Sequence, residues 1–200
     1  MEQIRSFIAI ELPEELKLGL AQLQDRLKSG KQSGVKWVDP YGIHLTLKFL
    51  GNIEVDRTGA ITSAIEATVQ GISPFHLEIK DLGAFPNLRR VQVIWVGVSG
   101  EVDKLGQLQQ RIESNLTPLG FTAEARSFTP HLTLARLQNQ ASLDERQGWG
   151  QLIANTKFEA VYSIEVEAIN LMRSQLTREG AIYNRISSIK LNKPLPTTTT

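Results

Sequence analysis

The same four residues, His-Leu-Thr-Leu, occur twice in this chain, at positions 44–47 and 131–134. Strict alternation of polar and apolar residues is typical of a strand with one buried face. We therefore expect His44 and Thr46 on one side of their strand, with the leucines on the other. His131 and Thr133 repeat this arrangement in the second half. The chain has three histidines, and two of them begin these copies.

Two imidazoles and two hydroxyls facing one small ligand could bind a phosphate and transfer protons on both of its sides. Imidazole titrates near pH 6.5, at about neutrality, and so serves as an acid or a base. A lone histidine on a strand is usually structural, but the repeated tetrapeptide favours a functional pair. The third histidine, His76, alternates with charged neighbours and is expected to be a solvated strand residue.

The elements that must position the motifs follow from periodicity and from turn and cap residues. Expected in the first part are a strand at 4–12, a helix from Pro13 to Gly30 with leucines at helical spacing, a strand at 35–38, a turn at 39–42, a motif strand ending at Gly51, and a helix capped by Asp56 and running to about Val69. From residue 75 onward we expect a strand at 75–82, a loop at 83–90, a central strand at 91–98, a helix containing residues 105–116, a short strand at 121–126, the second motif strand, a helix opened by a Ser142–Glu145 capping box, a strand at 158–171, a polar turn at 173–180 and a closing strand at 181–191.

Composition limits the class of protein. The chain has 200 residues, of which 41% are hydrophobic, and this is enough for a core. Its net charge of +1 provides no strong global field for nucleic acid, so an anion site must be built locally. The absence of cysteine excludes disulfides and thiolate chemistry, and no apolar run is long enough to span a membrane. We expect a monomeric cytoplasmic protein, with one domain at 1–191 and a disordered tail at 192–200.

The sequence segments around the two motifs resemble those of a known family. They are Trp37, the stretch His44-Leu-Thr-Leu-Lys-Phe-Leu-Gly51, the stretch Phe128-Thr-Pro-His-Leu-Thr-Leu-Ala-Arg136, and Leu171-Met-Arg-Ser174 with Gly180 and Tyr183. From about residue 4 to about residue 190, the chain resembles the two-histidine (2H) phosphoesterases. Within them it is most similar to the bacterial and archaeal RNA 2′,3′-cyclic phosphodiesterases, once described as 2′–5′ RNA ligases.

The resemblance implies an α+β, bilobal fold. Two antiparallel sheets with pseudo-two-fold symmetry would flank a central cleft, with helices on the outside. It also implies hydrolysis of a 2′,3′-cyclic phosphate at an RNA end to a 2′-phosphate, with no metal and no cofactor. By the same analogy His44 is the proton donor and His131 the proton acceptor, although the near symmetry of the site leaves open which histidine is which.

Three more residues are expected to hold the phosphate: Thr46 and Thr133 as hydrogen-bond donors, and Arg136 as a cationic clamp. Strict alternation puts Arg136 on the leucine face, so it reaches the site only if its strand twists, bulges or ends near Ala135. Lys48 is expected on the His44 face, in contact with RNA or at the rim. Two further sets are candidates for RNA contact, with core packing or solvation as the alternative: the aromatic residues Phe7, Trp37, Tyr41 and Phe128, and the loop residues Arg89 and Arg90.

Other functions remain open from the sequence. The same motif pair would serve a 2′–5′ linkage, a cyclic nucleotide, ADP-ribose cyclic phosphate or reversible 2′–5′ RNA ligation. A non-catalytic module that binds RNA ends is the alternative from a different class. Binding alone does not require paired proton donors, which favours an enzyme.

Overall fold

The computed structural model describes residues 2–30, 33–158, 161–178 and 180–192. Nine strands and four α-helices lie within them. Their bounds are β1 Gln3–Glu11, α1 Glu14–Ser29, β2 Val35–Trp37, β3 His44–Glu54, α2 Thr58–Val69, β4 Phe75–Phe85, β5 Val93–Gly100, α3 Val102–Leu116, β6 His131–Leu137, α4 Leu143–Asn155, β7 Tyr162–Val166, β8 Ala168–Leu176 and β9 Ala181–Lys190. Short 3₁₀ turns, η1 to η3, lie at Pro40–Gly42, Val55–Arg57 and Thr117–Leu119.

The strands form two sheets in which every pairing is antiparallel. The first sheet has the order β3-β1-β8-β9, and the second has the order β2-β6-β5-β4-β7. Apart from the extra edge strand β2, the two orders correspond strand for strand, with one motif strand in each sheet. Strand β4 joins the second sheet, whereas β8 and β9 return to the first, so neither sheet is built from one half of the chain alone. This α+β fold of two lobes with pseudo-two-fold symmetry agrees with the expectation.

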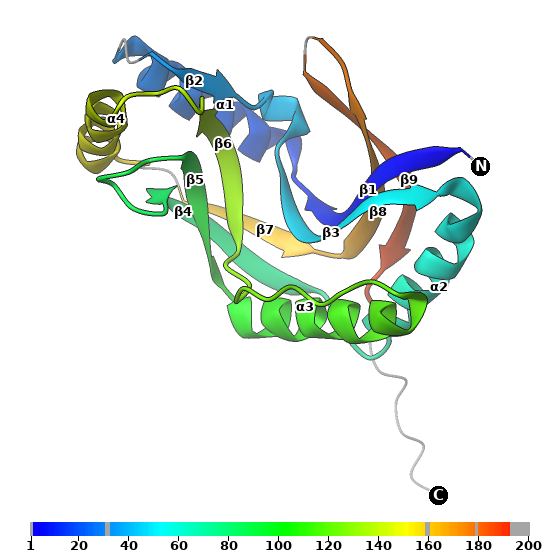
Figure 1. Ribbon diagram of the computed structural model, residues 1–200. Coiled ribbons are helices and arrows are strands. Elements are labelled where there is room, and N and C mark those ends of the chain that lie inside the picture. Colours follow the sequence, from blue (N-terminus) through cyan, green and yellow to red (C-terminus); the bar gives the residue numbers. More distant parts are fainter. Residues whose placement is uncertain (1, 31–32, 159–160, 179, 193–200) are drawn as a thin grey trace, which may run out of the picture.

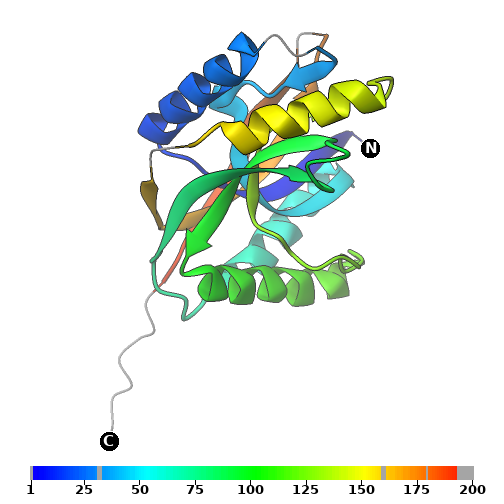
Figure 2. The ribbon, with the colours of Figure 1, turned by 90° about the vertical axis from the view of Figure 1, so that its left-hand side faces the viewer.

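The helices lie on the outside of the sheets, α1 and α4 at one end and α2 and α3 at the other (Figures 1 and 2). The leucine stripe of α1, residues Leu16, Leu20, Leu23 and Leu27, is at most 1% exposed, as its spacing predicts. Helix α4 begins with the predicted capping box. Ser142 Oγ accepts from the Glu145 amide, and the Ser142 amide donates to Glu145 Oε2. No helix in the described part of the chain has the length and apolar character needed to cross a bilayer.

Each motif strand contains a β-bulge at its second leucine. On β3 the pairing with β1 passes from Thr46 to Lys48, and this leaves Leu47 without a partner. On β6 the pairing with β5 passes from Thr133 to Ala135, which leaves Leu134 as the extra residue. An extra residue inverts the alternation beyond it and bends the strand. The equivalent bulges therefore change which side chains share a face with the histidines.

Several expected boundaries were wrong. Gly51 does not end its strand, because its φ of +72° lets β3 continue through an irregularity to Glu54. Helix α2 begins at Thr58, and Asp56 lies in the preceding 3₁₀ turn rather than at the cap. Four expectations on longer segments also changed: residues 121–126 form no strand, β4 runs on to Phe85, the segment 158–171 contains two strands rather than one, and β8 continues to Leu176 inside the expected turn. Residues 159–160, 179 and 193–200 of the expected strand, turn and tail lie outside the described residues.

Candidate active site

His44 begins β3 and is held by one hydrogen bond and two aromatic rings. Its Nδ1 lies 2.8 Å from the carbonyl oxygen of Gly42. Its imidazole stacks on Phe7, with ring centroids 4.5 Å apart and planes inclined by 27°. The Tyr183 ring packs against the imidazole in a T-shaped arrangement, with ring centroids 4.9 Å apart and planes inclined by 80°. These contacts hold the imidazole in one orientation, with its Nδ1 engaged by the backbone.

His131 begins β6 and is held in a similar way. Its Nδ1 lies 2.7 Å from the carbonyl oxygen of Thr129, two residues earlier, just as Gly42 precedes His44 by two. Phe85, at the end of β4, packs edge-on against the imidazole at 4.9 Å. Each histidine thus has the carbonyl oxygen of the residue two positions earlier as its partner, and each has an aromatic neighbour. The aromatic residues come from different strands.

The backbone carbonyls determine the tautomer of both rings. A carbonyl oxygen can only accept a hydrogen bond, so Nδ1 of His44 and of His131 must donate. In the neutral ring, Nε2 then carries the lone pair that can take a proton. Either ring can accept a proton at Nε2 or, when charged, donate one from it.

The first sheet is strongly curved where it holds His44. Phe7 pairs with Phe49, which lies five positions after His44 along β3, yet the rings of Phe7 and His44 stack. Figure 1 shows β1 and β3 bending together in this region. The bulge at Leu47 accounts for the bend, since an extra residue kinks a strand towards one face. Curvature therefore brings together side chains that a flat sheet would hold apart.

The two motif strands meet between the sheets. Strands β3 and β6 contact one another and run side by side near the centre of Figure 1. Beyond the bulge in β6, Ala135 is buried and Arg136 is exposed, so Arg136 lies on the face of His131 and Thr133. Strict alternation would place Arg136 on the leucine face, and the bulge at Leu134 moves it to the face of the histidine.

Tyr183 connects the two sheets electrostatically. Burial raises the pKa of its phenol, while the charges of Arg136 and Arg5 act in the opposite direction. Arg136 belongs to the second sheet, whereas Tyr183 on β9 contacts His44 in the first. Tyr183 is therefore influenced by a charge on the second sheet while its ring contacts His44 on the first. In the sequence only the family resemblance indicated Tyr183. No local pattern predicts that β9 belongs to the same sheet as the motif strand β3.

Comparison with known proteins identifies the family. A model of the family described as LigT-like phosphoesterase matches the chain twice, at residues 10–95 and 96–183, and each match contains one motif. The chain belongs to the LigT-like phosphoesterase family. The resemblance to 2H phosphoesterases is thereby confirmed.

Relatives of this phosphoesterase cover nearly its whole length. The RNA 2′,3′-cyclic phosphodiesterase of Methanothermobacter thermautotrophicus is 33% identical over 189 residues, covering 94% of this chain and 100% of the relative. The protein of the same name from Aeropyrum pernix is 34% identical over 173 residues, covering 86% and 94%. Among solved structures, Escherichia coli LigT complexed with 3′-AMP matches with a TM-score of 0.75 at 24% identity, covering 96% and 100% of the two chains. The protein TT0787 of Thermus thermophilus matches with a TM-score of 0.76, also at 24% identity, covering 95% and 99%. These structures share the bilobal fold.

The pKa of His44 in this phosphoesterase differs from that of a free imidazole. Burial lowers the pKa of His44, and the Gly42 hydrogen bond and the charge of Glu11 oppose this only in part. Glu11 is the cross-strand partner of His44. Its carboxylate accepts from Asn170 at 2.8 Å and from Arg185 at 2.6 Å. The partial burial of His44 thus favours its neutral form in the free protein.

Lys48 does not lie on the His44 face, contrary to expectation. Its side chain is 2% exposed, and its ammonium group contacts Glu113 Oε2 at 2.5 Å and the Thr122 carbonyl oxygen at 2.9 Å. The reason is the bulge at Leu47, which turns Lys48 inward and Phe49 outward. In this phosphoesterase Lys48 therefore anchors β3 to helix α3.

The other candidates divide between core and surface. Phe7 is buried against His44, and Trp37 packs edge-on against Trp149 at 5.8 Å, while Phe128 packs partly buried against the core. Tyr41 is 60% exposed, and Arg89, Arg90 and His76 are exposed as well. His76 is thus the solvated strand residue that the sequence predicts.

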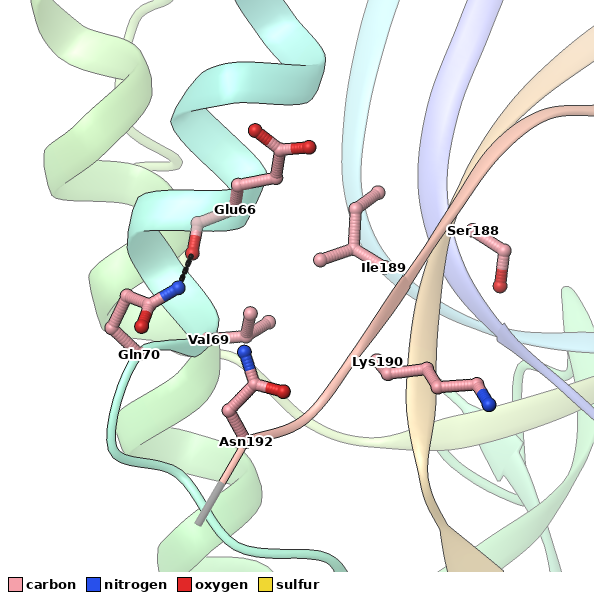
Figure 3. A pocket seen from close by; sticks show the side chains of 7 residues that line it. All are labelled: Glu66, Val69, Gln70, Ser188, Ile189, Lys190 and Asn192. Carbon is pink, nitrogen blue, oxygen red and sulfur yellow. Dashed lines mark hydrogen bonds between the residues drawn. The ribbon is translucent and has the colours of Figure 1, made fainter. Parts of the chain in front are cut away.

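Within the described residues, no three or more His, Cys, Asp or Glu side chains gather as metal ligands do. A hollow between α2 and β9, lined by Glu66, Gln70 and Lys190 among others, is shown in Figure 3. None of the motif residues lines it. It is not part of the candidate site of this family member.

Proposed function

We propose that this protein hydrolyses 2′,3′-cyclic phosphate ends of RNA to 2′-phosphate ends by metal-independent acid–base catalysis. The observation that carries the proposal is the matched hydrogen bonding of His44 and His131, each with its Nδ1 at a backbone carbonyl oxygen. Two relatives covering most of the chain bear the name RNA 2′,3′-cyclic phosphodiesterase, which supports this substrate class.

The proposed reaction uses one histidine on each side of the phosphorus. Nε2 of His131 takes a proton from water, and the water oxygen bonds to phosphorus. The P–O3′ bond breaks, and Nε2 of protonated His44 gives its proton to O3′. Water is thereby added across one P–O bond, leaving a 2′-phosphate and a 3′-hydroxyl. In the free protein burial lowers the pKa of His44 and favours its neutral form, whereas the negative charge of the bound phosphate favours the protonated form that donates.

Thr46, Thr133 and Arg136 would stabilise the charge that builds on the non-bridging oxygens. The threonines are half-buried next to their histidines, and Arg136 is exposed on the same face as His131. A guanidinium can bind two phosphate oxygens at once. Because one chain contributes both motifs, we propose action as a monomer, and the proposed site of action is the cytoplasm.

The test is incubation of the protein with a short RNA that ends in a 2′,3′-cyclic phosphate, in the presence and absence of EDTA. The expected product is a 2′-phosphate in equal yield under both conditions, lost in His44→Ala and in His131→Ala. A 3′-phosphate product would mean that O2′ rather than O3′ is the leaving oxygen, and it would overturn the assignment of His44 as the donor to O3′.

The same assay separates the alternatives. Turnover of ADP-ribose cyclic phosphate, a cyclic nucleotide or a 2′–5′ linkage, with no turnover of RNA ends, would retain the enzyme class and replace the substrate. Ligation would be detected as joined RNA when an acceptor with a 5′-hydroxyl is supplied. Binding of cyclic-ended RNA with no turnover of any of these compounds would support the binding module.

A further inference from the structure

Phe49 is an exposed aromatic residue on the face that carries His44. Its side chain is 57% exposed although it lies within β3, between buried neighbours. Its ring is 6.2 Å from that of Phe7, which stacks on His44. Within the fold's pseudo-symmetry Phe49 occupies the position of Arg136, because each follows a bulged leucine by two residues. An aromatic face at this position is available to a planar ligand next to the phosphate site.

A polar row crosses the same face of the first sheet one step farther along. Arg5 pairs with Asn52 on β3 and with Ser174 on β8, and Ser174 pairs with Tyr183 on β9. Directly opposed residues of neighbouring strands share a face, and Arg5 precedes Phe7 by two on β1, so the row lies on the Phe7 side. The effect of the Arg5 charge on Tyr183 agrees with this placement.

The row borders an open hollow suited to an anion. Arg5, Asn52, Arg173 and Ser174 are among its lining residues, which include no carboxylate. Arg173 is paired with Glu2 at 3.6 Å, whereas Arg5 has no ion pair within the part of the chain that the structure describes. Arg5 is therefore a cation that the fold leaves available beside the aromatic face.

We propose that Phe49, Arg5, Asn52 and Ser174 form a subsite for the RNA segment on the 5′ side of the cyclic end. Phe49 stacks on a base, and Arg5 binds a backbone phosphate with the help of Asn52 and Ser174. Exposed aromatics next to cations are how proteins bind single-stranded nucleic acid with little base preference. This inference rests on the proposed function and narrows its substrate to oligonucleotide ends over cyclic mononucleotides.

The kinetic test compares a 2′,3′-cyclic mononucleotide with a trinucleotide that ends in the same cyclic phosphate. We expect the wild-type kcat/KM to be at least tenfold higher for the trinucleotide. Phe49→Ala should lower the trinucleotide value by about 5- to 150-fold, the range for loss of one base stack, and leave the mononucleotide value within twofold. Phe49→Tyr, which keeps the aromatic face, should retain the wild-type kcat/KM for the trinucleotide. Leu18→Ala, which truncates a 52% exposed side chain on α1, is the matched control.

Arg5 is tested through its salt dependence. Removing one phosphate contact to a single strand should reduce the slope of log affinity against log salt by about 0.7. We expect this change in Arg5→Gln with the trinucleotide, and no change in Arg26→Gln, which removes the same charge from helix α1. Equal slopes in wild type and Arg5→Gln would remove Arg5 from the subsite.

A binding measurement keeps this inference separate from the proposed function. A labelled trinucleotide with a 2′-phosphate end is not a substrate for the proposed hydrolysis, and its affinity can be measured without turnover. Weaker binding in Phe49→Ala and Arg5→Gln, with unchanged binding of a 2′-phosphorylated mononucleotide, supports the subsite even if neither cyclic compound is hydrolysed. Unchanged trinucleotide binding, or equal wild-type turnover of both cyclic substrates, overturns the subsite even if the phosphodiesterase activity is present.

Discussion

The imidazole of His44 stacks on the ring of Phe7 at 4.5 Å, although Phe7 pairs with a residue five positions farther along β3. The stack removes water from one face of the imidazole. Burial of this kind disfavours the charged ring, and this is the main cause of the lowered pKa of His44. The curvature of one sheet thus sets the protonation chemistry of the candidate acid.

The first prediction concerns the titration of His44. In the free protein its pKa lies below the ordinary value of about 6.5. Phe7→Leu admits water and should raise the pKa, whereas Glu11→Gln removes a favourable charge and should lower it further. Titration of the imidazole signals by NMR, assigned with His44→Asn, measures both shifts. Shifts of the same sign in the two variants would contradict the proposed causes.

The same shift affects stability. Because folding lowers the pKa of His44, the unfolded chain binds this proton more readily below about pH 6.5. The contribution of His44 to the free energy of unfolding is therefore complete above that pH, and it is lost as the pH falls from 6.5 through the folded-state value. Urea unfolding of wild type and His44→Asn between pH 7.5 and about pH 5 should show a smaller loss of stability in the variant.

The second prediction concerns proton transfer. His44→Ala and His131→Ala should each lower kcat on cyclic-ended RNA by about 10²- to 10⁴-fold, the usual contribution of a positioned acid or base. Their combined effect should be smaller than the product of the two, since both act in one step. Thermal unfolding of the variants serves as the control for folding. Retention of wild-type kcat in either variant would contradict the two-histidine mechanism.

The third prediction concerns Arg136, which is exposed on the His131 face. Arg136→Lys retains the charge but loses the planar fork that binds two phosphate oxygens. We expect kcat/KM for cyclic-ended RNA to fall by roughly tenfold, or about 1.4 kcal/mol, with no change in thermal stability. Arg26→Lys, at an exposed position of helix α1, is the matched control. An equal effect of both substitutions would indicate a nonspecific loss.

The fourth prediction concerns the buried ion pair of Lys48 and Glu113, whose side chains are 2% and 14% exposed. Lys48→Met leaves the carboxylate of Glu113 without its cation, which should cost about 3–5 kcal/mol in the free energy of unfolding. Lys48→Met combined with Glu113→Gln should recover most of that loss. Lys104→Met, which breaks an exposed pair with Glu101, should leave the free energy of unfolding nearly unchanged, because water screens this pair. Urea unfolding measures all three.

Local features of the sequence predicted much of the fold. The leucines of α1, the capping box of α4 and the alternation at the start of each motif depend on neighbours a few residues away, and the structure agrees with all three. The repeated motif also predicted two equivalent strands and, through the resemblance, the family. Spacing alone is sufficient for these features because helix and strand periodicity is a property of the local backbone.

Only the tertiary structure decided what lies around the motifs. Lys48 is buried and Phe49 and Arg136 are exposed because Leu47 and Leu134 bulge, and a bulge depends on the partner strand's register. The positions of Phe7, Phe85 and Tyr183 against the imidazoles depend on which strands are neighbours in each sheet and on how strongly the sheet bends. The sequence by itself thus determined the candidate site residues and the strands that carry them, whereas long-range pairing decided which side chains share their face.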